Sequence, residues 1–158
     1  MLLTLFSRLK NSFLPSGGIE EGDPLPEFQL ENQDGRIVNS SEINDAIVFF
    51  YPRALTPGCT REACNFRDAF SHFEELDIDI YGISTDNVKN QRAFYDSEDL
   101  NYDLLADPKG KVCSKFGVLA RSGMAKRTTF VVKNGRIRKV FTKVNPEKHV
   151  EEVLESLR

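Results

Sequence analysis

Hydrophobic and polar positions follow two different periods along this chain, and the switches between them predict its elements. Short apolar runs bounded by turn residues are typical of buried strands, whereas apolar residues that recur every three or four positions are typical of helices. The expected strands are 28–30, 36–38, 46–50, 78–83, 104–106, 128–132 and 136–141. The expected helices are 59–76, 87–95, 109–116 and a closing helix that opens at Pro146.

Two of the turns between these elements are specific signals. Asp34-Gly35 and Asn134-Gly135 each lie between two short apolar runs, which is the pattern of a tight β-hairpin. Between the hairpins, strands and helices alternate. This order predicts an α/β sandwich in which a central mixed sheet lies between layers of helices.

Composition adds mainly exclusions. The 158 residues suit one domain, and 40% hydrophobic and 28% charged residues are normal for a soluble globular protein. The net charge of -3 gives no basic excess for binding nucleic acid. No run approaches the roughly 18 apolar residues of a membrane span, so we expect no stable membrane insertion.

The first twenty residues differ from the rest, so we expect an extension over 1–20 and the domain over 21–158. Apolar residues fall near one face of a predicted helix at Leu2, Leu5, Phe6, Leu9 and Phe13. Ser16-Gly17-Gly18 then predicts a flexible joint. We expect the helix to pack on the domain or on a neighbouring molecule. A membrane-surface anchor and a processed leader are the alternatives.

Cysteine and histidine usage favours thiol chemistry over a metal site. Three cysteines, Cys59, Cys64 and Cys113, are too few for a secreted disulfide scaffold. In a reducing compartment, two close cysteines are more often redox-active than structural. His72 and His149 follow no zinc-ligand spacing, and we interpret both as solvated helix residues. We therefore expect a cytoplasmic protein that needs neither a metal nor a cofactor.

Cys59 stands where a buried strand and a Thr-Pro-Gly turn lead into a helix. A thiol there meets unpaired backbone N–H groups and the positive end of the helix dipole, which favour the nucleophilic thiolate. Thr56 can aim a hydroxyl into the same pocket, and Pro52 can form its wall because it lacks an N–H. Arg127 is the best candidate for a cation that stabilises the thiolate and a bound pair of oxygens.

These residues carry a family resemblance. The pattern Pro52-x-x-x-Thr56-x-x-Cys59 resembles the active-site signature of the peroxiredoxins. The fuller run, which continues through Glu62-Ala63-Cys64, is similar to the PrxQ subfamily, also called bacterioferritin comigratory proteins. The similarity spans roughly residues 21–158. It implies a thioredoxin-like three-layer sandwich with an N-terminal β-hairpin, and reduction of hydrogen peroxide or organic hydroperoxides without metal or flavin.

The resemblance also implies roles for individual residues. Cys59 would be the peroxidatic cysteine and Cys64 the resolving cysteine, Pro52 and Thr56 would line the pocket, and Arg127 would be the arginine that the family carries at this strand. Thioredoxin or a glutaredoxin-like dithiol would regenerate the enzyme, which we expect to be a monomer that at most dimerises weakly. The chain departs from the family at positions 53–55, which read Arg-Ala-Leu where a Lys and acidic residues are frequent, and in its N-terminal extension.

Spacing along the helix sets a condition on the implied disulfide. Five residues of α-helix separate two Cα atoms by about 8–9 Å and by about 140° around the axis, whereas a disulfide tolerates at most about 7 Å. We therefore expect the helix start to unwind in each catalytic cycle, with Thr56-Pro57-Gly58 as the hinge.

Several alternatives stay open at this point. Cys64 could be a packed thiol, which would leave a one-cysteine peroxidase or a peroxide sensor that relays oxidation to a partner. Cys113 could fill the core or act as the resolving cysteine. Arg121 and Lys126 compete with Arg127 for the cationic role. A thioredoxin-type exchanger is disfavoured because four residues, not two, separate the close cysteines.

Overall fold

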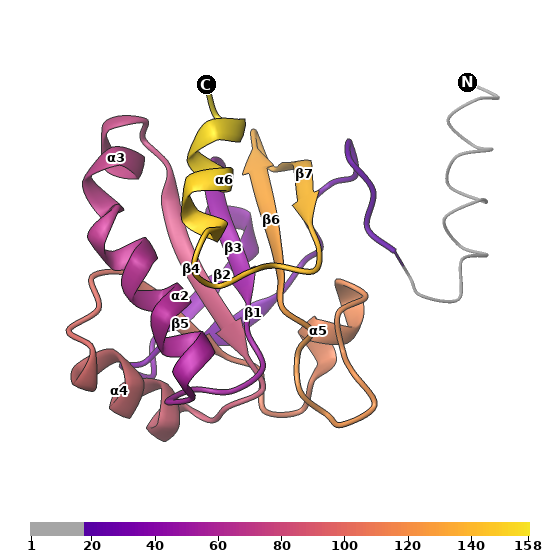
Figure 1. Cartoon of the computed structure of the whole chain (residues 1–158). Helices are drawn as coiled ribbons and strands as arrows, with labels where there is room; N and C mark the ends of the chain where they lie inside the picture. Colours follow the sequence, from indigo (N-terminus) through magenta and orange to yellow (C-terminus); the bar gives the residue numbers. More distant parts are fainter. Residues whose placement is uncertain (1–17) are drawn as a thin grey trace, which may run out of the picture.

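The computed structural model describes residues 18–158, in which a mixed sheet of seven strands is covered by helices on both faces (Figure 1). The strands are β1 (Gln29–Glu31), β2 (Ile37–Asn39), β3 (Ala46–Phe50), β4 (Asp79–Ser84), β5 (Asp103–Ala106), β6 (Thr128–Lys133) and β7 (Arg136–Phe141). The helices are the 3-10 turn η1 (Ser40–Glu42), α2 (Pro57–Asp68), α3 (Phe70–Glu75), α4 (Val88–Ser97), α5 (Lys111–Lys115) and α6 (His149–Ser156). The predicted sandwich is therefore confirmed, while the predicted N-terminal helix lies outside the described residues.

The strand order β2-β1-β5-β4-β3-β6-β7 places β3 near the middle of the sheet. β3 pairs in parallel with β4 and antiparallel with β6, in the register Phe50↔Thr128. Because neighbouring side chains of a strand point to opposite faces, β3 contributes to two cores. Ile47 and Phe49 pack under α2, α3, α4 and α6, on what we name the α2 face. Val48 and Phe50 pack under α5 and the N-terminal hairpin, on the α5 face.

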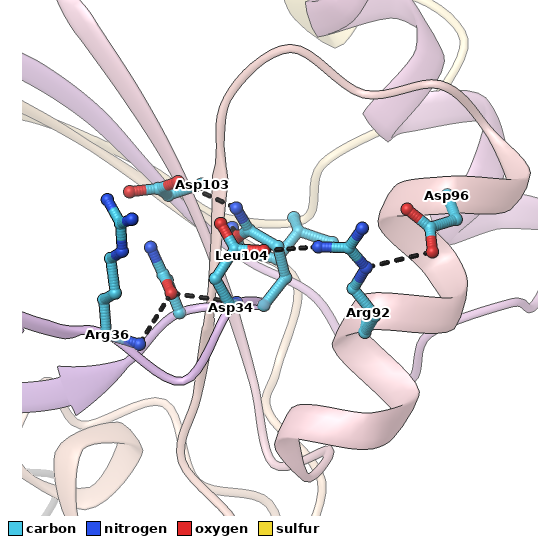
Figure 2. Close-up of polar contacts among 8 residues, drawn as sticks. Asp34, Arg36, Arg92, Asp96, Asp103 and Leu104 are labelled. Atoms are coloured by element: carbon cyan, nitrogen blue, oxygen red, sulfur yellow. Dashed lines mark hydrogen bonds and ion pairs between the residues drawn. The ribbon is translucent and has the colours of Figure 1, made fainter.

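Both predicted hairpins are present. Asn134 and Gly135 have φ of 53° and 72°, as a two-residue turn between antiparallel strands requires. The first hairpin, β1–β2, is tied to its neighbours by polar contacts that Figure 2 shows. In the turn, Asp34 pairs with Arg92 of α4, and Arg92 also binds Asp96 at 3.0 Å. Gln33 accepts a hydrogen bond from the Leu104 N–H at 2.9 Å, which fixes the hairpin beside β5.

Two helices differ from the prediction by more than two residues at a boundary. The helix expected over 59–76 is broken at Ala69, which separates α2 from α3. Phe66 and Phe73 would be about 10 Å apart along a straight helix axis, yet their ring centroids lie 6.0 Å apart in one core, and the break allows this contact. The closing helix begins at His149 instead of Pro146, because residues 146–148 form a turn.

Candidate active site

The loop after β3 carries Cys59 to the carboxyl end of that strand, where sheets of this kind commonly bind ligands. Cys59 is the third residue of α2 and is only 1% exposed. Its side chain belongs to the core of the α2 face. The sulfur therefore lies at a helix start, as predicted, but it is buried and not exposed to solvent.

Partly buried polar contacts hold this loop in shape. The Ala54 N–H donates to Asp86 Oδ2 at 2.7 Å, and the Ser84 hydroxyl donates to the same oxygen. Leu55 has a φ of 67°, a region that residues with a side chain rarely occupy. A residue held in such a conformation indicates that its surroundings fix the backbone strongly. The turn that positions Cys59 is thus pinned to the loop after β4.

Arg127 is the cation that the structure brings to Cys59. One guanidinium nitrogen, Nη2, lies 3.3 Å from Cys59 Sγ, and Nη1 donates to Glu62 Oε1 at 2.9 Å. Arg127 directly precedes β6, and the pairing of β6 with β3 places it beside the loop that follows β3. A guanidinium in this position stabilises negative charge on the sulfur.

The other predicted pocket residues lie close by along the chain. Thr56 is the N-cap residue of α2, and its hydroxyl donates to the Arg53 carbonyl at 2.7 Å instead of capping the helix. Pro52 is half-buried between β3 and that turn. Cys64 is half-exposed on α2, where burial raises the pKa of its thiol and Arg67 opposes that effect.

Glu62 is a buried acid that binds the same guanidinium as Cys59. It follows Cys59 by three positions on α2, so both side chains lie on the inward side of the helix. Burial raises the pKa of Glu62 to about 7 even though Arg127 opposes the shift. Its second oxygen, Oε2, has no hydrogen-bond partner among residues 18–158. The sequence alone carried no signal that Glu62 would be fully buried.

The interpretation of His149 as a solvated residue is wrong. Its ring is 0% exposed, and its Nε2 lies 2.7 Å from the Thr129 hydroxyl. Phe66 and Phe141 contact the ring edge-on, and burial lowers the pKa of His149 to about 4. The helical spacing of His149 and Val153 was the available signal, since residues four apart share a helix face. His72 is exposed, as expected.

Neither a metal-binding cluster nor a membrane-spanning helix occurs among the described residues. Across residues 18–158, no three His, Cys, Asp or Glu side chains gather where they could hold a metal ion. In the same range, no helix has the length and apolar character to cross a bilayer. The chemistry that this arrangement offers is nucleophilic attack by a thiolate that a guanidinium stabilises.

Comparisons with known proteins agree with this geometry. The chain is 37% identical over 150 residues to peroxiredoxin Bcp of Escherichia coli K12, an alignment that covers 89% of this chain and 96% of the relative. It is also 37% identical to the chloroplastic peroxiredoxin Q of Suaeda salsa, over 89% of this chain and 68% of that protein.

Solved structures give the same result. The crystal structure of peroxidoxin BcpB from Mycobacterium tuberculosis superposes with a TM-score of 0.81 at 36% identity, covering 89% of this chain and 97% of that one. A cysteine-to-serine mutant of PrxQ from Xylella fastidiosa superposes with a TM-score of 0.82 at 25% identity, covering 88% and 95%. The AhpC/TSA family matches residues 21–140. The chain therefore belongs to the AhpC/TSA family, and it is a thiol-dependent peroxidase related to peroxiredoxin Bcp and peroxiredoxin Q.

Proposed function

We propose that this peroxidase reduces hydrogen peroxide and organic hydroperoxides through a cycle of two cysteines, in which Cys59 attacks the peroxide and Cys64 resolves the product. The observation that carries the proposal is the 3.3 Å contact between Arg127 Nη2 and Cys59 Sγ. It pairs the nucleophile with a permanent cation at a helix start.

The first step is a two-electron oxidation of sulfur. The Cys59 thiolate attacks one oxygen of the hydroperoxide, a sulfur–oxygen bond forms and the O–O bond breaks. Cys59 becomes a sulfenic acid, and the leaving oxygen takes a proton to give an alcohol, or water when the substrate is hydrogen peroxide. Arg127 stabilises the negative charge as it moves from the sulfur to the leaving oxygen.

Thr56 and Pro52 take supporting roles in this proposal. The Thr56 hydroxyl lies at the N-cap of α2, three residues before Cys59, and because its own proton goes to the Arg53 carbonyl, its oxygen can accept a hydrogen bond from the peroxide O–H. Pro52 has no N–H, so it forms a wall that does not compete for the peroxide.

Resolution requires α2 to change shape. Cys59 and Cys64 lie in one continuous helix, in which their Cα atoms are about 8–9 Å apart, beyond the roughly 7 Å that a disulfide spans. We expect the first turns of α2 to unwind about the Thr56-Pro57-Gly58 hinge. The Cys64 thiol then attacks the Cys59 sulfenic acid, a disulfide forms and water leaves.

The position of Cys113 supports Cys64 over Cys113 as the resolving cysteine. Cys113 is fully buried in the core of the α5 face, whereas Cys59 belongs to the core of the α2 face. The sheet lies between the two cores, so local unwinding of α2 does not bring Cys59 to Cys113.

The remaining parts of the cycle follow from the chemistry of disulfides. A dithiol such as thioredoxin or a glutaredoxin-like protein reduces the Cys59–Cys64 bond by exchange and becomes a disulfide itself. Such reductants operate in reducing compartments, so we assign the enzyme to the cytoplasm. Separately, we expect it to act as a monomer.

Peptide mapping after oxidation tests the proposal. The protein is treated with an equivalent amount of hydrogen peroxide, alkylated, digested without reductant and analysed by mass spectrometry. We expect a Cys59–Cys64 disulfide in the wild type and a sulfenic acid at Cys59, trapped by dimedone, in Cys64→Ser. A disulfide that involves Cys113 would move the resolving role, and an unmodified Cys59 would refute the peroxidatic role.

A further inference from the structure

The two halves of α2 are held in different ways. In the half that follows Glu62, the Tyr102 hydroxyl donates to the Ala63 carbonyl at 2.7 Å. Arg67 Nη1 donates to the Glu98 carbonyl at 2.6 Å, and the Asn101 side chain donates to the Arg67 carbonyl at 3.3 Å. Three contacts therefore tie this half to the 98–102 loop, which leads directly into β5.

A further contact fixes the same half of α2 from the other side. The Asn65 side chain donates to the Pro146 carbonyl at 3.2 Å, in the turn before α6. Tyr102 itself is a rigid support, because it is only 6% exposed and its ring packs edge-on against Phe49 of β3, with centroids 5.8 Å apart. Cys64, between Ala63 and Asn65, is thus held in place by its neighbours.

The side-chain contacts that hold the first half of α2, residues 57–62, to the rest of the domain come mainly from Arg127. Arg127 binds both Cys59 and Glu62. The ion pair between Arg61 and Glu147 is also present, but its side chains are 60% and 64% exposed, and such pairs contribute little to stability. The bond to Cys59 is strongest while the sulfur carries negative charge, because it is then an ion pair as well as a hydrogen bond. Oxidation to a neutral sulfenic acid therefore weakens the hold on this half specifically.

We infer that unwinding of α2 stops at Ala63, and that Tyr102 is the positioning residue which keeps Cys64 in place while Cys59 moves toward it. This inference rests on the proposed two-cysteine cycle and adds the boundary of the motion to it. A stationary Cys64 keeps the effective concentration of the two sulfurs high after the first turns are released. Without the Tyr102 anchor, unwinding spreads past Cys64 and both sulfurs become mobile.

The Tyr102→Phe variant removes the hydroxyl and keeps the ring, so the packing against Phe49 is retained. We expect Cys59 to be oxidised by hydrogen peroxide at the wild-type rate, while formation of the Cys59–Cys64 disulfide slows by about threefold to tenfold, the range that one buried hydrogen bond supports. Because the sulfenic acid then persists, excess peroxide converts more Cys59 to sulfinic acid. The matched control is Tyr95→Phe, on α4, where the ring lies beside Arg92.

Rapid quenching with an alkylating reagent, followed by intact-mass measurement, separates the two steps. A Tyr102→Phe protein that forms the disulfide as fast as the wild type, or faster, overturns the inference. Absence of a Cys59–Cys64 disulfide in the wild type would instead refute the proposed function, so the two failures are distinguishable.

Amide exchange followed by NMR in the oxidised wild type gives an independent readout. Amides of 61–66 should lose protection, because their acceptor carbonyls lie in the released turns. Amides of Arg67, Asp68 and Ala69 should keep it, because their acceptors lie at or after Ala63. Loss of protection at these three residues would contradict a boundary at Ala63.

Discussion

Cys59 and Cys113 occupy equivalent positions on opposite faces of the sheet. Each is the third residue of a helix, α2 or α5, and they are 1% and 0% exposed. Their charged neighbours differ in sign. Arg127 lies against the Cys59 sulfur, whereas Asp107 accepts the Cys113 backbone N–H at 2.8 Å. Burial, together with Asp107, raises the pKa of the Cys113 thiol well above its ordinary value.

Because both cysteines occupy a helix start, that position alone does not account for the reactivity proposed for Cys59. At α5 the backbone N–H groups of Val112 and Cys113 are already occupied by Asp107, whose carboxylate also offsets the positive end of the helix. At α2 the Thr56 hydroxyl bonds elsewhere, and a guanidinium faces the sulfur. We propose that the charged side chain near the sulfur, more than the helix, decides which thiol reacts.

Removing the cation from the α2 face should have the largest effect. In Arg127→Gln we expect the second-order rate of Cys59 oxidation by hydrogen peroxide to fall by about a hundredfold or more, as loss of one such donor does in other active sites. The neighbouring Lys126→Gln removes the same charge from an exposed position and should change the rate by less than about twofold. Stopped-flow peroxide consumption measures both. Equal losses in the two variants would assign the effect to net charge and not to the contact with Cys59.

The α2 face also holds two buried titratable groups, Glu62 and His149, which should make the stability of this face depend on pH. The folded-state pKa of Glu62, about 7, is above its unfolded value of 4.5, so its contribution to stability falls as the pH rises from 4.5 to 7. The folded-state pKa of His149, about 4, is below 6.5, so its contribution rises as the pH rises from 4 to 6.5. Between pH 4.5 and 6.5 the two slopes oppose each other.

Replacing one group at a time should reveal how the other makes the free energy of unfolding depend on pH. We expect the contributions of Glu62 and His149 to the wild-type free energy of unfolding to cancel between pH 4.5 and 6.5. The free energy of unfolding should rise by about 2 kcal/mol over this range in Glu62→Gln and fall by about 2 kcal/mol in His149→Asn, because a full bound proton is worth about 1.4 kcal/mol per pH unit and each group is partly titrated at one end of the range. Urea unfolding at several pH values measures the slopes. The same slope in both variants would contradict this assignment.

The smallest effect is expected on the α5 face. Cys113→Ser places a hydroxyl in an apolar core and should lower the free energy of unfolding by about 1–3 kcal/mol. Peroxidase activity at a temperature where the variant is folded should stay within about twofold of the wild type. Denaturant unfolding and a coupled peroxidase assay are the measurements. A large loss of activity in the folded variant would show that Cys113 participates in the reaction.

The parts of the fold that sequence predicted well are those that neighbouring residues determine. The Asn134-Gly135 turn needs two residues that tolerate positive φ, and the apolar run 46–50 needs burial on both faces. The position of Cys59 at a helix start followed from the Thr-Pro-Gly turn in the same way. These features depend on interactions within a few residues.

The features that sequence did not predict depend on contacts between distant segments. Arg127 is 68 residues from Cys59, and only the pairing of β6 with β3 brings the two side chains together, so the sequence named it as the best candidate but left Arg121 and Lys126 as competitors. The break at Ala69 reflects a contact between two phenylalanines in the core. The burial of His149 depends on where α6 starts relative to β6, which periodicity alone did not fix.

The most direct test compares the two buried sulfurs in one protein. In Cys64→Ser, hydrogen peroxide is added, the reaction is quenched at intervals, and mass spectrometry gives the oxidation rates of Cys59 and Cys113 separately. We predict that Cys59 reacts at least about a thousandfold faster, because Arg127 stabilises its thiolate while burial and Asp107 keep Cys113 protonated. Comparable rates at the two sulfurs would contradict the claim that the charged neighbour decides reactivity.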